Sequence, residues 1–223
     1  MKDITLIIPA KNEKESLPKV LTELKKFDYK ILVVLHSIDI ETINSIKNHD
    51  IEILYQTNHG YGDALITGIK YVKTKFFCIF NADGSFKPDE IELMYKNINK
   101  NNYDIIFGSR YSKNGKSDDD TFVTFIGNYF FSTLGKVLFR LNINDILYTF
   151  VLGKTEKVNQ IELTSNDFCF CVELPIKAKK IGLTLSEISC HERSRIAGKK
   201  KVNAVKDGFL ILIGMISLFI NNI

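Results

Sequence analysis

The sequence has few cysteines and none of the segments that direct a chain into or across a membrane. Its four cysteines include no C-x-x-C pair, which argues against a zinc or dithiol motif. The N-terminal residues lack the apolar core of a signal peptide, so we expect a cytoplasmic protein with reduced thiols. No apolar run reaches the roughly 18–20 residues that cross a bilayer.

A strong charge of one sign is also missing. The formal net charge is +4, and no helix-turn-helix or RNA-binding motif accompanies it, so we expect no nucleic-acid partner. The basic residues gather between Arg193 and Lys201, and the apolar stretch Phe209–Ile220 follows. This order is typical of a peripheral membrane anchor, and equally of a core helix or a homo-oligomer contact. We therefore divide the chain into one domain, residues 1–205, and a C-terminal apolar helix, residues 206–223.

What the sequence does contain is an alternation of short apolar runs and helical patterns. The early runs predict buried strands, at residues 4–8, 31–35, 51–55 and 76–80. Helical patterns between these runs predict a doubly wound, mostly parallel sheet with flanking helices. Later runs predict further strands, at residues 104–107, 148–152, 168–172 and 183–189. A long apolar helix is predicted at 122–141, and the polar residues 112–120 predict a mobile loop in which Asp118–Asp120 is solvated.

Polar residues follow each of the first four strands. Because the carboxyl ends of parallel strands share one edge of a sheet, these segments should converge on one crevice that suits a nucleotide. The segments concerned are residues 9–13, 35–39, 58–62 and 81–83. His36, at the second of these ends, is explained equally well as a contact to the base or ribose and as a surface residue.

Asp83 closes an apolar strand and is followed by Gly84. A carboxylate in this place could hold Mg²⁺ or Mn²⁺ against a diphosphate, because these ions need few protein ligands when phosphate oxygens are present. From residues 81–84 alone, however, a simple turn is the better interpretation. Cys169 and Cys171 lie in the predicted strand 168–172, where buried small hydrophobes are a better interpretation than metal ligands.

Several segments together form a more specific pattern. They are IIPAKNE (7–13), NHGYGDALITGIKY (58–71), FNADGSFKPDEI (80–91), GSRY (108–111) and ERSRIAGKKK (192–201). In this order and spacing they resemble family 2 glycosyltransferases with the GT-A fold, especially those related to dolichyl-phosphate mannosyltransferase and bacterial polyprenyl-phosphate glycosyltransferases. The resemblance implies a Rossmann-like α/β domain and inverting transfer of a sugar from a nucleotide-diphosphate sugar.

The resemblance and the strand ends together assign site residues. The candidate nucleotide-binding residues are Pro9, Ala10, Asn12, Glu13, His36, Gly60, Gly62, Asn81 and Ala82. The candidate metal ligands for Mg²⁺ or Mn²⁺ are Asp83 and Asn81. The candidate catalytic residues are Asp83, Arg110, Asp145 and Asp167, the last two as bases for a hydroxyl acceptor. The candidate residues for an acceptor phosphate are Arg193, Arg195 and Lys199.

Four residues, in three segments, depart from the family pattern. Leu35 and His36 replace the acids that read the base, Asn81 replaces the first acid of the D-x-D motif, and Thr149 replaces a glycine. The main prediction is a polyprenyl-phosphate glycosyltransferase at the cytoplasmic face of a membrane. One alternative is a soluble glycosyltransferase with a hydroxyl acceptor. The other is a catalytically weakened domain that binds a nucleotide or a partner without turnover.

Overall fold

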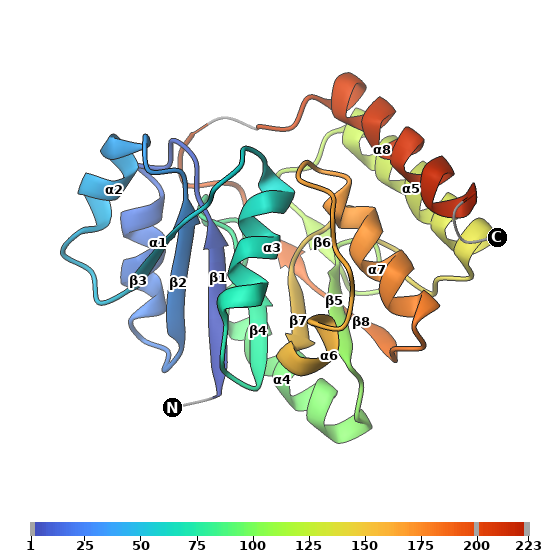
Figure 1. The fold of residues 1–223 in the computed structure, drawn as a ribbon, viewed down its shortest axis with the longest axis horizontal. Helices are drawn as coiled ribbons and strands as arrows, with labels where there is room; N and C mark the ends of the chain where they lie inside the picture. The colour runs from blue at the N-terminus through green and yellow to red at the C-terminus, as the bar shows by residue number, and fades with distance from the viewer. Residues whose placement is uncertain (1–2, 199–200, 221–223) are drawn as a thin grey trace.

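The computed structural model describes residues 3–198 and 201–220. Within them, one seven-stranded sheet forms the centre of the molecule (Figure 1). Its strands run, from one edge to the other, β3 (Glu52–Tyr55), β2 (Lys30–Leu35), β1 (Ile4–Pro9), β4 (Phe76–Ile79), β7 (Val151–Lys154), β5 (Ile105–Ser109) and β8 (Leu185–Ser189). All neighbours pair in parallel except β7, which is antiparallel to both β4 and β5. The predicted α/β architecture with a mostly parallel sheet is confirmed.

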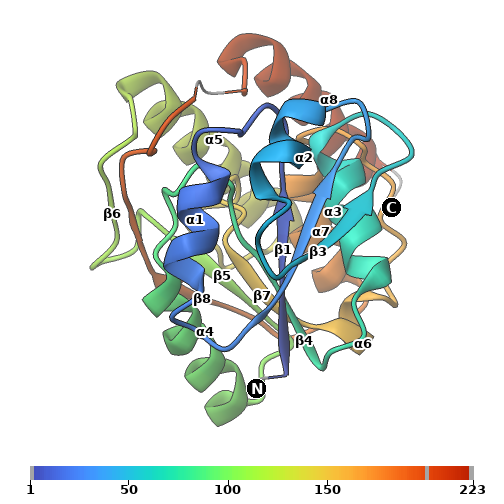
Figure 2. The same cartoon turned by 90° about the vertical axis from the view of Figure 1, so that its left-hand side faces the viewer.

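Helices cover both faces of this sheet (Figure 2). One face carries α1 (Leu17–Leu24), α2 (Ile40–Ile46) and α4 (Pro88–Asn101). The other carries α3 (Tyr61–Tyr71), α6 (Thr155–Val158) and α7 (Phe170–Lys180). Side chains of a strand alternate between faces, so Leu6 and Ile8 of β1 pack in the first core while Ile7 packs in the second. Burial on both faces explains why these strands read as continuous apolar runs.

Two predicted elements differ from the structure. Residues 168–172 are not a strand, because α7 begins at Phe170, so Cys169 and Cys171 share no sheet face. A short apolar run cannot be distinguished from a buried helix by periodicity alone, and here most of α7 is buried. Both cysteines are nevertheless buried, as expected. The strand expected at 148–152 begins only at Val151.

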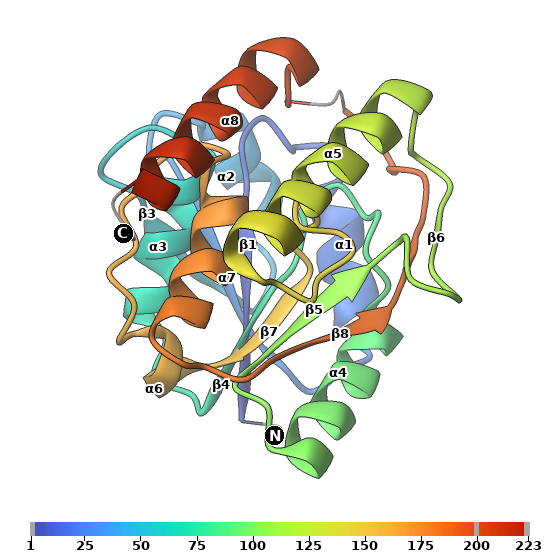
Figure 3. The same ribbon diagram turned by 90° about the vertical axis from the view of Figure 1, so that its right-hand side faces the viewer.

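Two apolar helices lie side by side at one end of the molecule (Figure 3). They are α5 (Phe122–Phe139) and α8 (Ala204–Ile220), and they form a third core with α7. Ile211 and Met215 of α8 are buried in this core. Contrary to the expectation from the sequence, α5 is long and apolar enough to cross a membrane by length and composition, and only 22% of it is buried.

Candidate functional site

The loops after β1 and β2 lie against one another at the carboxyl edge of the sheet. The Asn12 backbone N–H donates to Asp39 Oδ2 at 2.7 Å, and the Glu13 N–H donates to Thr42 Oγ1 at 2.9 Å. Asn12 has a φ of 52°, a left-handed conformation that asparagine tolerates well. Three other predicted nucleotide-binding residues are partly or fully buried, namely Pro9 and Ala10 at the end of β1 and Ala82 after β4.

Two histidine rings stack at the ends of β2 and β3. The His36 and His59 ring centroids lie 4.6 Å apart, and their planes differ by 2°. His36 is half-buried and His59 is exposed. Sequence reasoning singled out His36 but missed His59, since a lone histidine in a loop carries no local signal of its partner.

The glycine pair at the start of α3, with Gly60 as its N-cap and Gly62 in its first turn, permits a close approach between two parts of this chain. A Cβ at Gly60 would lie 2.0 Å from the Asn166 carbonyl oxygen, and one at Gly62 would lie 2.1 Å from the Ser165 oxygen. Gly60 also has a φ of 127°, which a side chain would oppose. The backbone that approaches these glycines in the structure is that of the 165–167 loop.

The Glu173 carboxylate anchors the 165–167 loop through hydrogen bonds. Its buried carboxylate accepts hydrogen bonds from the Thr164 and Ser165 backbone N–H groups and pairs with Lys177 at 2.6 Å. Burial by itself raises the pKa of Glu173, but these partners outweigh it, so the pKa lies below its ordinary value. Asp167, at the exposed end of the loop, accepts from the Cys169 N–H near the start of α7. The loop thus presents Asp167 on an anchored support.

Asn81 and Asp83 form the turn that follows β4. Asn81 uses its side-chain oxygen to accept from the Phe86 N–H at 3.3 Å and its amide nitrogen to donate to Ser85 Oγ. Asp83 Oδ1 accepts from the Ser85 N–H at 3.0 Å, and Asp83 Oδ2 lies 3.5 Å from Arg195 Nη1. The turn interpretation therefore describes Asn81 well. Asp83 keeps one oxygen directed outward from the turn.

Within the residues that the structure describes, no three or more His, Cys, Asp or Glu side chains are grouped to hold a metal ion. The Asn81 side chain is held within the turn, since its oxygen accepts from the Phe86 N–H and its amide nitrogen donates to Ser85 Oγ. Asp83 fits as a single carboxylate ligand. Such a ligand suits a cation whose remaining oxygens come from phosphate and water.

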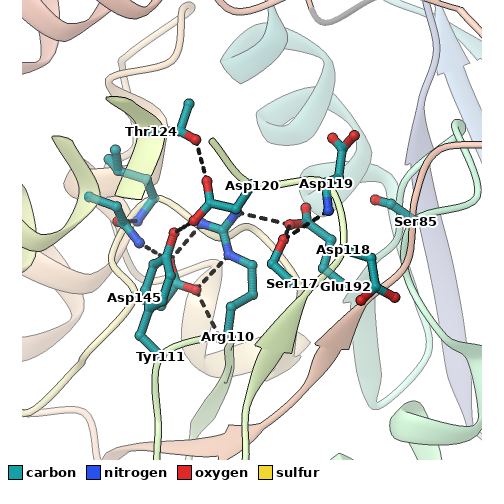
Figure 4. Close-up of polar contacts among 12 residues, drawn as sticks. Ser85, Arg110, Tyr111, Ser117, Asp118, Asp119, Asp120, Thr124, Asp145 and Glu192 are labelled. Carbon is teal, nitrogen blue, oxygen red and sulfur yellow. Dashed lines mark hydrogen bonds and ion pairs between the residues drawn. The ribbon is translucent and has the colours of Figure 1, made fainter. Parts of the chain in front are cut away.

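Arg110 and Asp145 form a buried ion pair (Figure 4). Arg110 Nε and Nη2 donate to the two Asp145 oxygens at 2.8 and 2.9 Å, and the Arg110 backbone N–H donates at 2.9 Å. Asn128 donates to Asp145 as well, and Glu192 accepts from Arg110 Nη1 at 3.1 Å. Burial lowers the pKa of Arg110, but the two carboxylates outweigh it and raise that pKa, so the guanidinium stays charged.

This pairing bears on the roles expected of both residues. Asp145 is 0% exposed and accepts from the Arg110 side chain and backbone and from Asn128. A general base needs an oxygen within reach of the acceptor's proton, so the geometry favours Asp145 as the residue that positions Arg110. The Arg110 guanidinium also lies over the Tyr148 ring, 4.6 Å from its centroid. Asn128 and Glu192 come from distant parts of the chain and were not among the predicted site residues, although Glu192 begins the segment 192–201 that contributes to the family resemblance.

The acidic run 118–120, expected to be part of a solvated, mobile loop, has a partner for each of its three side chains. Asp118 pairs with His191 at 2.6 Å, Asp119 pairs with Arg195 at 3.2 Å, and Asp120 accepts from Tyr111. The neighbouring β6 (Lys116–Ser117) pairs with β9 (His191–Glu192) in a small second sheet. Figure 4 shows this run beside Arg110 and Glu192. Partners distant in the sequence thus hold a segment whose local pattern is typical of a loop.

The basic segment after β9 lies along the turn that contains Asp83. Arg193 binds Glu23 of α1 at 2.9 and 3.0 Å, so its charge is directed to that helix. Lys201 pairs with Glu13. Lys199, the third predicted acceptor residue, lies outside the described residues.

Comparison with known proteins identifies the family. Residues 5–161 match the sequence model of glycosyl transferase family 2. The chain belongs to this family. An uncharacterized protein of Methanocaldococcus jannaschii is 29% identical to this glycosyltransferase over 96% of the chain and 91% of its own length. An uncharacterized glycosyltransferase of Mycobacterium tuberculosis is 25% identical over 94% of each chain.

Solved structures share the fold of this family 2 glycosyltransferase. Glucosyl-3-phosphoglycerate synthase from Mycobacterium tuberculosis, in a complex with Mn²⁺, UDP and glucosyl-3-phosphoglycerate, superposes with a TM-score of 0.77. It is 10% identical, and the match covers 96% of this chain and 79% of that one. Mannosyl-3-phosphoglycerate synthase from Rubrobacter xylanophilus gives a TM-score of 0.72 at 12% identity, over 96% and 72% of the two chains. The chain is therefore a nucleotide-sugar transferase with the GT-A fold.

Proposed function

We propose that this glycosyltransferase transfers a sugar from a nucleotide-diphosphate sugar to a polyprenyl phosphate at the cytoplasmic face of a membrane. The proposal depends mainly on the apolar surface of α5 and α8. Most large hydrophobic side chains that are exposed in the described part of the chain lie on these two helices. We call them the apolar face, consisting of Phe122, Val123, Phe125, Ile126, Tyr129, Phe130, Val137, Val205, Phe209, Leu210, Ile213, Ile216, Phe219 and Ile220.

The composition of the apolar face favours lipid as its occupant. Between Gly208 and Ile220, α8 carries no charged residue, and α5 carries only Lys136. Soluble monomers rarely expose contiguous apolar patches larger than a few hundred Å². Tyrosine is favoured where lipid meets water, and Tyr129 is exposed on α5. A surface of this kind can insert shallowly among lipid headgroups.

The other side of α5 is bound to the domain, so we expect α5 to lie on the membrane and not to cross it. Asn128 binds Asp145, and Ser132 Oγ accepts from the Ile146 N–H at 3.1 Å. A helix that crossed the bilayer would have to expose these polar groups to lipid, which costs several kcal/mol for each unpaired group.

Asp83 is the residue that we assign to a divalent cation, Mg²⁺ or Mn²⁺. The glucosyl-3-phosphoglycerate synthase structure contains Mn²⁺ together with UDP, which supports this assignment. Such a cation would neutralise the charge of the departing nucleoside diphosphate. The loops that carry Asn12, Glu13, His36 and His59 would surround the nucleoside, because they border the same edge of the sheet.

A phosphate acceptor also agrees with the buried position of Asp145. A phosphate oxygen is already ionised at neutral pH, so its attack on the sugar requires positioning and charge stabilisation more than a strong base. This requirement agrees with the burial of Asp145, which favours a positioning role for that residue. Direct attack on the anomeric carbon breaks its bond to the diphosphate and inverts its configuration.

A second candidate acceptor is a small phosphorylated molecule with a hydroxyl group. Two observations favour it. Asp167 is exposed at the end of its anchored loop, where it could accept a hydroxyl proton. The structurally similar Mycobacterium tuberculosis enzyme was crystallised with glucosyl-3-phosphoglycerate.

Transfer assays separate the two candidates. Binding of UDP or GDP is measured first by calorimetry, with and without Mn²⁺. The protein is then given radiolabelled nucleotide sugars together with either polyprenyl phosphate in liposomes or 3-phosphoglycerate. Label in the lipid fraction supports our proposal, and label only in phosphoglycerate favours the second candidate. Binding of nucleotide without any transfer would favour a catalytically weakened domain.

Liposome flotation tests the apolar face directly. Replacing Phe209 and Ile213 with glutamate should abolish flotation with the liposomes. The matched control is Ile38→Glu, which changes an exposed isoleucine in the loop before α2 and should float as the wild type does. If the wild type does not float, and light scattering shows a dimer that the double variant loses, a second copy of the chain covers this face instead.

A further inference from the structure

The segment of residues 193–198 is fastened to the turn that carries Asp83. The Arg193 N–H donates to the Ser85 carbonyl at 2.8 Å, and the Ile196 N–H donates to the Asp83 carbonyl at 2.8 Å. The Ile196 side chain covers Gly84 so closely that a Cβ there would lie 2.3 Å from Ile196 Cδ1. The segment therefore lies directly over the residue that we assign to the cation.

Arg195 places a positive charge against that residue. Its Nη1 lies 3.5 Å from Asp83 Oδ2, and its Nη2 lies 3.2 Å from Asp119 Oδ2. The guanidinium thus occupies a position between two carboxylates. Its Nε is buried and donates to no acceptor among the residues that the structure describes. A buried donor without an acceptor destabilises this arrangement, so the guanidinium retains an unused donor for a new acceptor.

We infer that Arg195 competes with the divalent cation for Asp83, and that it moves to the donor diphosphate when cation and nucleotide bind together. This inference depends on the proposed role of Asp83 in the donor site. A cation at Asp83 would repel the guanidinium, whereas the diphosphate offers it oxygens that a guanidinium binds with two parallel hydrogen bonds. The cation alone offers Arg195 no new acceptor, and the diphosphate alone does not displace Arg195 from Asp83. The cation and the nucleotide should therefore strengthen each other's binding.

The exchange predicts a measurable coupling between the two ligands. Allosteric couplings in proteins amount to roughly 5–150-fold in affinity. For the wild type we expect UDP to tighten Mn²⁺ binding by at least about fivefold. In Arg195→Ala, Mn²⁺ without nucleotide should bind more tightly than in the wild type, because the competing charge is gone. The additional tightening by UDP should shrink, because the diphosphate has lost a ligand. A residue with a purely structural role would not change these two affinities in opposite directions.

Mn²⁺ binding is measured by electron paramagnetic resonance of the free ion, with and without UDP. Arg195→Lys keeps the positive charge and should retain the competition, while losing part of the coupling. The charge-matched control is Lys100→Ala in the last turn of α4, which should leave both affinities unchanged. Circular dichroism of each variant establishes that it is folded before binding is compared.

Movement of the segment has its own readout. The chain contains no tryptophan, so Ser194→Trp introduces a single fluorophore at an exposed position of the segment. Its emission should shift when Mn²⁺ and UDP are added together, and little with either one alone. If the wild type binds Mn²⁺ and UDP through Asp83 but Arg195→Ala matches it in both affinities, the inference is overturned and the donor site stands. If Asp83→Ala leaves Mn²⁺–UDP binding intact, the proposed cation site itself fails.

Discussion

Replacement of Asp145 with asparagine tests whether the buried pair with Arg110 supports the fold. In the wild type, Asp145 is fully buried and its two oxygens receive hydrogen bonds from Arg110 and Asn128. Asparagine keeps the shape of the side chain but removes its charge. It also turns one oxygen into an amide nitrogen, which would face N–H donors instead of receiving hydrogen bonds from them.

The expected loss can be estimated from the remaining contacts. Removing one partner of a buried ion pair costs about 3–5 kcal/mol, because the other charge is left without compensation. Here Glu192 would still accept from Arg110 Nη1 at 3.1 Å, so we expect the lower end, about 3 kcal/mol. For a chain of this length, each kcal/mol lowers the melting temperature by about 2–4 °C. The variant should therefore melt about 6–12 °C below the wild type.

Urea unfolding followed by circular dichroism measures this loss of stability. Glu192→Gln is the matched control, because glutamine can still accept from Arg110 while Asp145 neutralises the charge. We expect the control to lose only about 1 kcal/mol, the value of one ordinary hydrogen bond. If Asp145→Asn also loses less than about 1 kcal/mol, the pair does not support the fold as we describe.

Three further predictions concern the anchored loop and the buried thiols. In Gly62→Ala the new Cβ would lie 2.1 Å from a carbonyl oxygen, so we expect a loss of about 1–3 kcal/mol in urea unfolding and weaker UDP binding by calorimetry. Gly127→Ala, on α5 with nothing within 4 Å, should be neutral or stabilising, and equal losses in both variants would contradict the packing argument. Because the folded pKa of Glu173 is lowered, its contribution is complete above its ordinary pKa of 4.5 and is lost as the pH falls through the folded value. Glu173→Gln should therefore show a flatter decline of stability below that pH, and an unchanged slope would refute this role. Burial raises the pKa of the cysteine thiols, to about 12 for Cys169, so Ellman's reagent should react slowly with the native protein and with four thiols in urea. Rapid reaction of any thiol in the native state would show that its side chain is accessible.

The order of elements could be predicted from the sequence because local patterns encode it. The runs that became β1, β2 and β4 are almost entirely apolar, which is typical of strands buried on both faces of a parallel sheet. The strand predicted at 168–172 was wrong because a short apolar run suits a buried helix as well as a strand. The positions of Asp83 and His36 at strand ends followed from the direction of the chain alone.

Partnerships between side chains could not be predicted in this way. Arg110 and Asp145 are 35 residues apart, and Arg195 and Asp119 are 76 apart. Whether two such groups meet depends on how helices and loops pack over the sheet, and no local pattern records that. The same limit applies to Gly60 and Gly62, whose missing side chains indicate a close approach but not what approaches.

By itself, the sequence determined the α/β class, the resemblance to the glycosyltransferase family and the strand ends at which we propose the donor site. Periodicity and short-range spacing are local properties, so they can be read without coordinates. Only the tertiary structure decided that Asp145 is buried in an ion pair with Arg110 and that Arg195 pairs with Asp83. It also decided that α5 and α8 leave many large apolar side chains exposed. Those outcomes depend on which surfaces are buried when distant segments pack together, and burial determines whether a charge is paired, accessible or free to move.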